Sequence, residues 1–416
     1  MTDGDVTVGK SADTHARIVV TDAGSRLTIN GGMALAVDNS LAAVTVSNGG
    51  LLETSGLVTV GNVRTDSLLH GSGILVDGGD WDVGGHSVIL SMGQDGSGRL
   101  DIRNGGKVLD IDRLTVARRE VDANVELRNG GVLQASDVVL GGEAETVKTV
   151  ETRRSCYQRS FFGGRRCVEW EETVFETIGG SGEGFMFADG LGTTVVVDDM
   201  LIGEGGSGVL DVWNSAVVNV ANHLNVHDNG VINLNGGSIN IGDITSPANS
   251  NAIHVGPGGV LSGTGTINGD IINQGGGVHV PGHSPGLMTV NGDYVLGADS
   301  FLVIEVEGIS AGQFDVLNIL GDANFSGDIV FDFSYAPQAG DSFDFLSVAG
   351  LLTNNVTFGF AGLEDDFQFD TSFDGTTLSM MALSDGQMIV PEPSAWAMAG
   401  IGVVAFAFFA CRRRRV

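Results

Sequence analysis

Short stretches of alternating apolar and polar residues recur along most of the chain, and glycine-rich turns follow them. Asn-Gly-Gly ends such a stretch at Asn30, Asn48, Asn104, Asn129 and Asn235, and Asp77-Gly78-Gly79 is a variant of this turn. Alternation of this kind predicts a β-strand with one buried face. Asn and Gly fit the turns because both tolerate a positive φ. The pattern therefore predicts an all-β chain.

A second apolar strand follows several of these turns, so that one unit of roughly 25 residues holds two or three short strands. Examples are Leu114-Thr115-Val116 and Val138-Val139-Leu140. A unit of this size cannot bury its own apolar face, so the units must stack. We therefore predict a solenoid, a right-handed parallel β-helix in which stacked Asn side chains bond between turns. The alternative is an antiparallel meander in which each Asn-Gly forms a type I′ hairpin.

The pattern divides the chain into three parts. The β-helical repeat domain covers residues 1–290 and contains an inserted segment at 143–178. From Tyr294 onward the repeat fades and Phe becomes frequent. We expect residues 291–388 to form an antiparallel β-domain that caps the open end of the solenoid. Residues 389–416 form a C-terminal tail.

The inserted segment alternates charged and apolar residues around Phe161-Phe162-Gly163-Gly164, which predicts a projecting β-hairpin. Folding at this turn sets Cys156 opposite Cys167 and Arg154 opposite Glu169. Cys156 and Cys167 are therefore a candidate disulfide, with cross-strand charge pairs beside it. Two interpretations of the hairpin stay open. It is a contact arm for an acidic partner, such as the acidic body of a neighbouring copy, or a tolerated insertion with solvated charges.

The charge of the chain narrows the range of its partners. Asp and Glu number 51 against 21 Lys and Arg, which gives a formal net charge of -30. A body this acidic repels phosphate backbones, so we expect no nucleic-acid partner. Gly supplies 65 residues but Pro only 7, and Gly has no three-residue period, so a collagen helix is excluded.

The C-terminal tail has three parts. Pro391, Glu392 and Pro393 precede an uncharged apolar run at 394–411, and the run is followed by Arg412, Arg413, Arg414 and Arg415. As a helix this run measures roughly 27 Å, close to the hydrocarbon thickness of about 30 Å. It therefore predicts one transmembrane helix. The four arginines form a stop-transfer cluster that stays in the cytoplasm and leaves the body on the far side of the membrane.

This order of parts resembles the PEP-CTERM sorting signal of Gram-negative and related bacteria, and the resemblance covers the tail alone. It implies recognition by an exosortase, a membrane protease-transpeptidase that cleaves near the Pro-Glu-Pro motif. The protein would be held briefly in the inner membrane with its body outside, and then released or attached at the cell surface. Members of this family commonly accompany exopolysaccharide or biofilm matrix.

The repeats from Gly24 to Phe345 resemble passenger regions of autotransporters and of other PEP-CTERM proteins with β-strand repeats. The closing stretch of such passengers is similar to three segments here: Gly263-Thr264-Gly265-Thr266-Ile267, Pro281-Gly282-His283-Ser284-Pro285-Gly286 and Gly292-Asp293-Tyr294.

The beginning of the sequence lacks an apolar signal-peptide core, although the tail demands export. Val6-Thr7-Val8-Gly9 also repeats the later Val58-Thr59-Val60-Gly61. We therefore expect the natural start of the protein to lie upstream of Met1.

Residues that could carry chemistry are few. Gly282-His283-Ser284-Pro285-Gly286 matches the G-x-S-x-G nucleophile elbow, but that elbow needs a strand that enters a helix, which this all-β setting denies. His223 and His227 lack the helix and the glutamate of a zinc motif, and we interpret them as exposed turn residues. The acidic pairs Asp110-Asp112 and Asp198-Asp199 are interpreted as solvated turn residues. We expect no catalytic residue, no metal and no cofactor.

Two functions fit these observations. The first is an exported structural or adhesive protein of the cell surface or extracellular matrix. Its partners would be an exosortase, the membrane, and exopolysaccharide or other surface proteins. The second is a carbohydrate-active enzyme, a glycan hydrolase or lyase, because β-helices host such sites on one exposed face. Three or more carboxylates clustered in a groove across adjacent turns would favour the enzyme, and scattered carboxylates would favour the structural protein.

Overall fold

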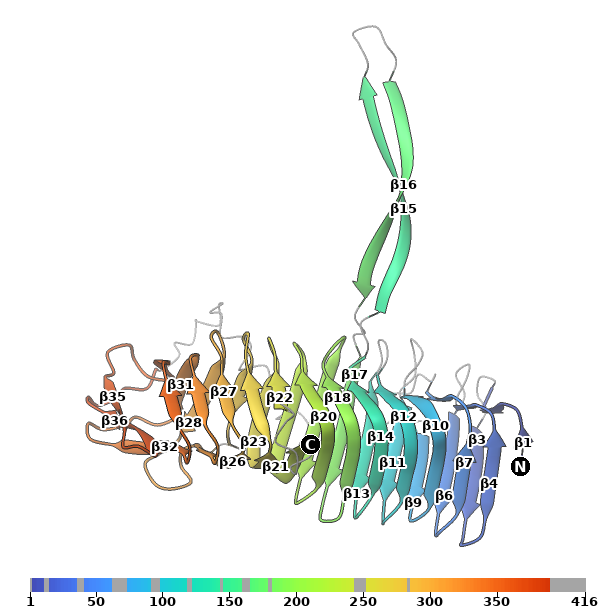
Figure 1. Cartoon of the computed structure of the whole chain (residues 1–416), viewed down its shortest axis with the longest axis horizontal. Helices are drawn as coiled ribbons and strands as arrows, with labels where there is room; N and C mark the ends of the chain where they lie inside the picture. The colour runs from blue at the N-terminus through green and yellow to red at the C-terminus, as the bar shows by residue number, and fades with distance from the viewer. Residues whose placement is uncertain are drawn as a thin grey trace.

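The computed structural model describes residues 2–10, 15–35, 41–61, 73–90, 98–117, 122–142, 145–158, 165–178, 182–242, 252–282 and 285–389, with 145–158 and 165–178 described by their backbone. These residues form β-strands and turns, and no α-helix occurs among them. Figure 1 shows most strands stacked into one long solenoid, from which a two-stranded ribbon projects. The prediction of a parallel β-solenoid is confirmed by the strand pairings given below.

The chain crosses three faces of the solenoid in each turn, and each face is a parallel sheet built from successive turns. The first face contains β3 (His15–Thr21), β6 (Leu41–Ser47), β9 (Gly73–Asp77), β11 (Gly98–Arg103), β13 (Ala123–Arg128), β17 (Glu183–Asp189), β19 (Ser207–Trp213), the first parts of β21 (Gly230–Ile241) and β23 (Val260–Asn268), β25 (Val278–Val280), β28 (Phe301–Val306), β31 (Asp328–Phe333) and β34 (Thr357–Ala361).

Several strands bend at a corner and serve both the second and the third face. The second face contains β1 (Thr2–Asp3), β4 (Arg26–Asn30), β7 (Leu51–Thr54), the first parts of β10 (Asp80–Leu90), β12 (Lys107–Val116), β14 (Val132–Leu140), β18 (Thr194–Ile202) and β20 (Val217–Val226), the second parts of β21 and β23, β26 (Leu287–Asn291), β29 (Val316–Ile319) and β32 (Ser342–Val348).

The third face contains the second parts of the strands that bend at the corner between the second and third faces. It contains β2 (Val6–Val8), β5 (Met33–Leu35), β8 (Val58–Val60), the second parts of β10, β12, β14, β18 and β20, then β22 (Ala252–Val255), β24 (Asp270–Asn273), β27 (Tyr294–Leu296), β30 (Ala323–Phe325) and β33 (Leu352–Asn354).

The core is a set of side-chain columns that run along the solenoid axis. Val46, Val76, Ile102, Leu127 and Ala188 are register partners on successive turns of the first face, and all five are fully buried. Burial of an aliphatic side chain of the size of Val or Leu contributes about 1.5–3 kcal/mol relative to exposure. Each turn therefore depends on its neighbours for stability, as the size of one repeat predicts.

The Asn-Gly-Gly turns owe their sequence to backbone geometry. Asn104 and Gly105 have φ values of 54° and 75°, in the left-handed region that Asn and Gly tolerate. A Cβ at Gly106 would lie 2.4 Å from the carbonyl oxygen of Val76 in the preceding turn. The predicted bonding between stacked turns is confirmed, since Asn129 Nδ2 donates to Asn104 Oδ1 at 3.3 Å.

The parallel solenoid extends farther than the sequence predicted. The strands from β27 to β34 pair in parallel with the preceding turn, so residues up to Ala361 do not form the antiparallel domain expected over 291–388. Side chains alternate between interior and surface in parallel and antiparallel sheets alike, and buried Phe residues such as Phe325, Phe331 and Phe345 fill the interior in this region. Among the described residues from Tyr294 onward, antiparallel strand pairs form between β32 and β36 (Thr377–Ala382) and between β35 (Phe369–Phe373) and β36, and isolated antiparallel bridges join Val306 to Phe314 and Leu363 to Met388.

The same parallel pairings exclude the antiparallel meander of the repeats. The handedness of the solenoid stays a prediction. The predicted transmembrane helix at 394–411 lies outside the described residues. Within the described part of the chain, no helix is long and apolar enough to span a bilayer.

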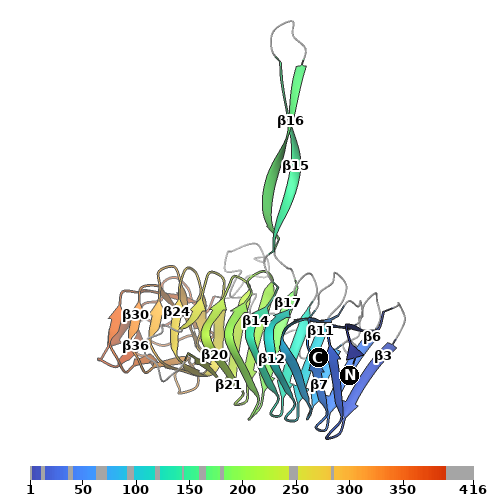
Figure 2. The ribbon, with the colours of Figure 1, turned by 45° about the vertical axis from the view of Figure 1, so that its right-hand side comes forward.

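The projecting ribbon consists of β15 (Glu145–Gln158) and β16 (Arg165–Ile178), which pair antiparallel. It leaves the solenoid between β14 on the third face and β17 on the first face. Figures 1 and 2 both show it extending away from the stacked turns rather than lying along them. The ribbon therefore adds a second, separate surface to the solenoid.

Candidate functional site

A row of charged residues crosses four consecutive turns at the corner between the second and third faces. Arg113 on β12, Asp137 on β14, Asp199 on β18 and His223 on β20 are register partners in that order. We call these four residues the corner row. Neighbouring strands of a sheet lie about 4.8 Å apart, so the row brings together residues that are far apart in the sequence.

The corner row is joined by side-chain contacts at both ends. Arg113 Nη1 lies 3.9 Å from Asp137 Oδ2. Asp199 Oδ1 lies 2.9 Å from His223 Nδ1 and also accepts the backbone N–H of His223 at 3.2 Å. Asn222 Nδ2 donates to the other oxygen, Asp199 Oδ2, at 3.1 Å. Asp199 thus has defined partners on the next turn.

The pKa values of the two carboxyl groups of the row are shifted in opposite directions. Partial burial raises the pKa of Asp137, and the neighbouring acids Asp199, Asp112 and Asp198 add to this against the opposing effect of Arg113. Burial also acts upward on the pKa of Asp199, but the hydrogen bonds from Asn222 and His223 outweigh it, and the net shift is downward. Two adjacent acids with separated pKa values are a pattern that acid–base chemistry can use.

Metal chemistry receives no support at this corner. Within the described ranges, no group of three or more His, Cys, Asp or Glu residues is arranged to hold a metal ion. The row is also open to solvent, because the side chains of Asp137 and Asp199 are 44% and 37% exposed. It therefore lacks the enclosed surroundings of a usual small-molecule site.

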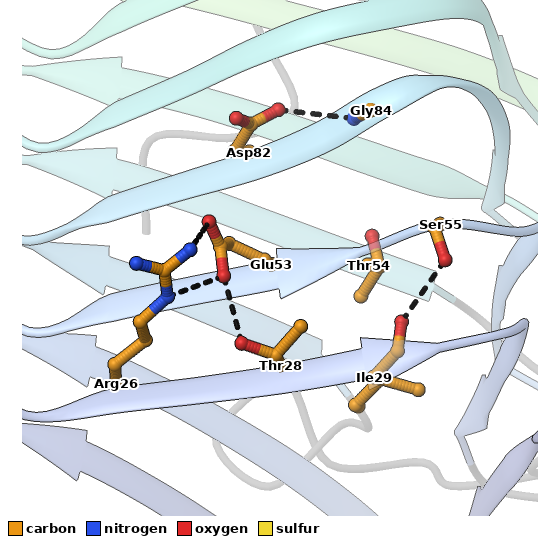
Figure 3. Close-up of a pocket in the computed structure, with 8 residues that line it drawn as sticks. All are labelled: Arg26, Thr28, Ile29, Glu53, Thr54, Ser55, Asp82 and Gly84. Atoms are coloured by element: carbon orange, nitrogen blue, oxygen red, sulfur yellow. Dashed lines mark hydrogen bonds and ion pairs between the residues drawn. The ribbon is translucent and has the colours of Figure 1, made fainter. Parts of the chain in front are cut away.

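A shallow hollow lies at a different place, on the second face near the N-terminal end of the solenoid (Figure 3). Its volume is about 260 Å³, and it is lined by Arg26, Thr28, Ile29, Glu53, Thr54, Ser55, Asp82 and Gly84. Glu53 accepts Arg26 Nε at 2.6 Å and Thr28 Oγ1 at 2.8 Å. These bonds, with that from Arg26 the larger, lower the pKa of Glu53.

The charged groups of this hollow already have partners. Arg26 and Glu53 form an ion pair, and Asp82 Oδ1 accepts the backbone N–H of Gly84 at 3.0 Å. The hollow is also smaller than the roughly 300–1,000 Å³ of typical ligand sites. We interpret it as a polar contact between turns of the solenoid.

A third set of polar residues lies inside the solenoid. Asp315 is fully buried, and its Oδ1 and Oδ2 accept the backbone N–H groups of Gly286 and Glu305 at 2.8 and 2.9 Å. Burial raises the pKa of Asp315 to about 8. His279 is also fully buried, and its Nδ1 lies 3.0 Å from the hydroxyl of Tyr294. Both groups face partners of the protein itself, so they fix the fold rather than offer a site.

Several residues that the sequence marked lie outside the described residues. These are Pro391, Glu392 and Pro393 of the sorting motif, Arg412, Arg413, Arg414 and Arg415 of the stop-transfer cluster, and His283 and Ser284 of the G-x-S-x-G match. Cys156 and Cys167 are register partners in the ribbon, as are Arg154 and Glu169. The disulfide between these two cysteines stays a prediction.

The structure corrects the interpretation of three marked groups. Asp110 and Asp112 lie within β12 rather than in a turn. His223 is exposed but lies within β20 rather than in a turn, and it contacts Asp199. Asp198 and Asp199 likewise lie within β18, so they are strand residues at a corner. Reasoning from the sequence missed Arg113 and Asp137. The sequence holds a usable sign, because each residue of the corner row directly precedes the first apolar residue of the next strand segment, as Asp137 precedes Val138.

Comparison with known proteins adds information chiefly about the tail. Residues 390–415 match the PEP-CTERM protein-sorting motif. This match confirms the sorting motif expected from the sequence and implies an exported, surface-directed protein that an exosortase recognises. No curated protein matches the chain. Among solved structures, the crystal structure of the Haemophilus influenzae Hap adhesin is similar at 11% sequence identity and a TM-score of 0.25, over 89% of this chain and 59% of that one.

Proposed function

We propose that the chain is a structural or adhesive protein displayed outside the cell, with the solenoid as its rod and the ribbon as its contact element. The observation that carries the proposal is the PEP-CTERM sorting motif at residues 390–415, attached to a solenoid that is parallel over most of its length. The motif supplies the route outward. The solenoid supplies a stiff body, because every turn is hydrogen-bonded to the next and shares one core with it.

The tail would act in two steps. Residues 394–411 would hold the precursor in the inner membrane, with Arg412 to Arg415 in the cytoplasm. An exosortase would then cleave near Pro391-Glu392-Pro393 and leave the body at the surface or in the matrix. The strongly acidic body suits contact with neutral or basic matrix components, since it would repel acidic polymers.

Cell fractionation tests this function. In cells that have the exosortase, we expect the body in the surface or matrix fraction without its tail, and in cells that lack the enzyme we expect the full-length chain in the inner membrane. Substitution of Pro391 and Pro393 by Ala should retain the precursor in the membrane, whereas Pro337→Ala in the body should not. Full-length protein dissolved in the cytoplasm of normal cells would contradict the proposal.

The corner row supports a second candidate function, a glycan hydrolase. Asp137 and Asp199 lie on adjacent turns with pKa values shifted in opposite directions, and Asp112 and Asp198 lie close enough to influence Asp137. The structural proposal is preferred because the hollow of Figure 3 is lined by other residues. Release of reducing ends from neutral glycans by the purified chain, abolished in Asp137→Asn and Asp199→Asn, would favour the enzyme.

A further inference from the structure

The ribbon of β15 and β16 pairs with no other strand among the described residues, so both of its edges are open. Each strand has 14 residues, which is about 45 Å of extended chain. Among the described residues, the two strands form a two-stranded sheet of their own, separate from the sheet of the solenoid. An isolated two-stranded ribbon is marginally stable in water, and open edges are templates for pairing with another strand. The ribbon therefore has the architecture of an element that is completed by a partner.

Charge is segregated along the ribbon. The distal half, from Arg153 on β15 and up to Trp170 on β16, carries four arginines and one glutamate in the described strands: Arg153, Arg154, Arg165, Arg166 and Glu169. The proximal half carries five glutamates and one lysine: Glu145, Lys148, Glu151, Glu171, Glu172 and Glu176. The boundary is sharp, because Arg153 is the register partner of Trp170 and Thr152 that of Glu171.

The proximal half also contains a like-charge pair. Glu151 and Glu172 are direct register partners across the two strands. Like charges directly opposite each other destabilise an antiparallel pair. A cationic neighbour along the ribbon would relieve this repulsion. The arginine-rich distal half of a second copy's ribbon would supply such a neighbour.

We propose that the ribbons of two copies of this chain pair side by side in antiparallel orientation, so that the basic distal half of each lies along the acidic proximal half of the other. The arrangement is isologous, since both copies contribute the same surface, and it closes as a two-fold dimer. Main-chain hydrogen bonds between the open edges would extend two strands to four, and the charge pattern would fix the orientation. The inference does not depend on where in the cell the protein resides.

Charge-swapped variants of the full chain, purified in a mild detergent, test the proposal by sedimentation. The distal variant carries Arg153→Glu, Arg165→Glu and Arg166→Glu, and the proximal variant carries Glu145→Arg, Glu171→Arg and Glu176→Arg. The register partners of these six positions are uncharged, so the pairings within each hairpin stay free of new like charges. Every sample keeps the same tail, so association through the tail would be equal in all of them.

We expect the wild-type chain to dimerise, and each variant alone to dimerise at least tenfold more weakly. An equal mixture of the two variants should regain a dimer that contains one copy of each. Raising the salt concentration should weaken the wild-type dimer, because exposed charge pairs are screened. The milder pair Arg166→Glu and Glu176→Arg repeats the test if either triple variant loses strand content by circular dichroism.

Three results would overturn the proposal. One is a wild-type chain that stays monomeric at 100 µM. Another is a mixture of well-folded variants that does not form the mixed dimer. The third is a proximal variant that self-associates as strongly as wild type, which would instead indicate that the arginines bind the acidic solenoid of another copy.

Discussion

Asn240 donates its side-chain amide to Asn219 Oδ1 one turn earlier, at a distance of 2.7 Å. Asn268 donates to Asn240 in the same way, and Asn291 donates to Asn268, each at 2.5 Å. These four residues are register partners on the second face and form a ladder along the solenoid axis. The ladder links turns that share no local sequence contact.

Asn240→Ala should therefore destabilise the solenoid by about 1–3 kcal/mol, because it removes two hydrogen bonds, one that Asn219 Oδ1 accepts and one that Asn268 Nδ2 donates, and both of these groups are part-buried. Denaturant unfolding monitored by circular dichroism measures the change. Asn318→Ala is the matched control, since Asn318 is half-buried on the same face and its side chain makes no hydrogen bond to the described residues. Equal losses in both variants would mean that the ladder adds nothing.

Gly106 and Gly105 should respond differently to alanine. Gly105 has space around a Cβ but a φ of 75°, so Gly105→Ala costs the strain of a left-handed residue, about 1–2 kcal/mol. At Gly106 the new Cβ would lie 2.4 Å from Val76 O, a backbone atom of the adjacent turn. Gly106→Ala should therefore cost more than Gly105→Ala in thermal unfolding. Gly105→Asn, which restores a residue tolerant of positive φ, should lose less than Gly105→Ala.

The positions of glycine and asparagine also show how far the sequence could predict the fold. The repeat of Asn-Gly-Gly after alternating strands predicted stacked turns, because each residue of the turn has a backbone requirement of its own. The end of the solenoid could not be predicted in the same way. Residues such as Phe331 and Phe345, whose rings meet edge to face at 4.9 Å, fill the interior where earlier turns use aliphatic side chains. A change in core composition therefore looked like a change of domain.

The corner row shows the corresponding limit for sites. Asp199 was singled out in the sequence because it follows Asp198. In the structure its register partners are Asp137 on the preceding turn and His223 on the next turn. Those contacts depend on register between turns. Register is set by how each turn packs on its neighbour, and the long insertion between Asp137 and Asp199 hides the repeat length in the sequence.

The candidate disulfide between Cys156 and Cys167 can be tested on the full-length precursor from cells that lack the exosortase, because this form keeps Cys411 of the tail while its body lies outside the cytoplasm. We expect one thiol, that of Cys411, to react with an alkylating agent in the unreduced, denatured chain, and three thiols to react after reduction. Mass spectrometry gives both numbers. Cys156→Ser should leave two free thiols without reduction and make the ribbon more sensitive to protease, because closing a short loop by a disulfide contributes about 2–3 kcal/mol. Three reactive thiols in the unreduced chain would exclude the bond.

His279 should make the protein sensitive to acid. Burial lowers the pKa of His279 to about 3 from an ordinary value of 6.5. Below pH 6.5 the unfolded chain binds a proton that the folded chain does not, so stability falls as the pH drops toward 3, by up to about 1.4 kcal/mol per pH unit. His279→Phe should show a shallower loss between pH 6.5 and 4. The exposed His86, changed to Phe, is the control and should keep the wild-type slope.

Asp315 should act in the opposite direction at higher pH. Its pKa is raised to about 8 by burial, against 3.8 for an ordinary aspartate, so between these values the folded chain holds a proton that the unfolded chain has released. Stability then falls as the pH rises, by at most about 1.4 kcal/mol per pH unit, until the folded carboxyl also ionises near pH 8. As the pH rises from 4 to 6.5, this loss of stability opposes the stability that the protein gains through His279. From pH 6.5 to 8 the fall from Asp315 acts without that opposing gain.

Unfolding free energies between pH 6.5 and 8 therefore isolate Asp315. We expect wild-type stability to decline over this range and Asp315→Asn to remove the decline. Asp315→Asn should also be less stable than wild type at pH 6.5 by about 1–3 kcal/mol, because its amide group would face one of the two backbone N–H donors of Gly286 and Glu305. The exposed Asp365, changed to Asn, should leave the decline intact. A decline that persists in Asp315→Asn would mean that the two N–H donors keep the buried carboxylate ionised throughout.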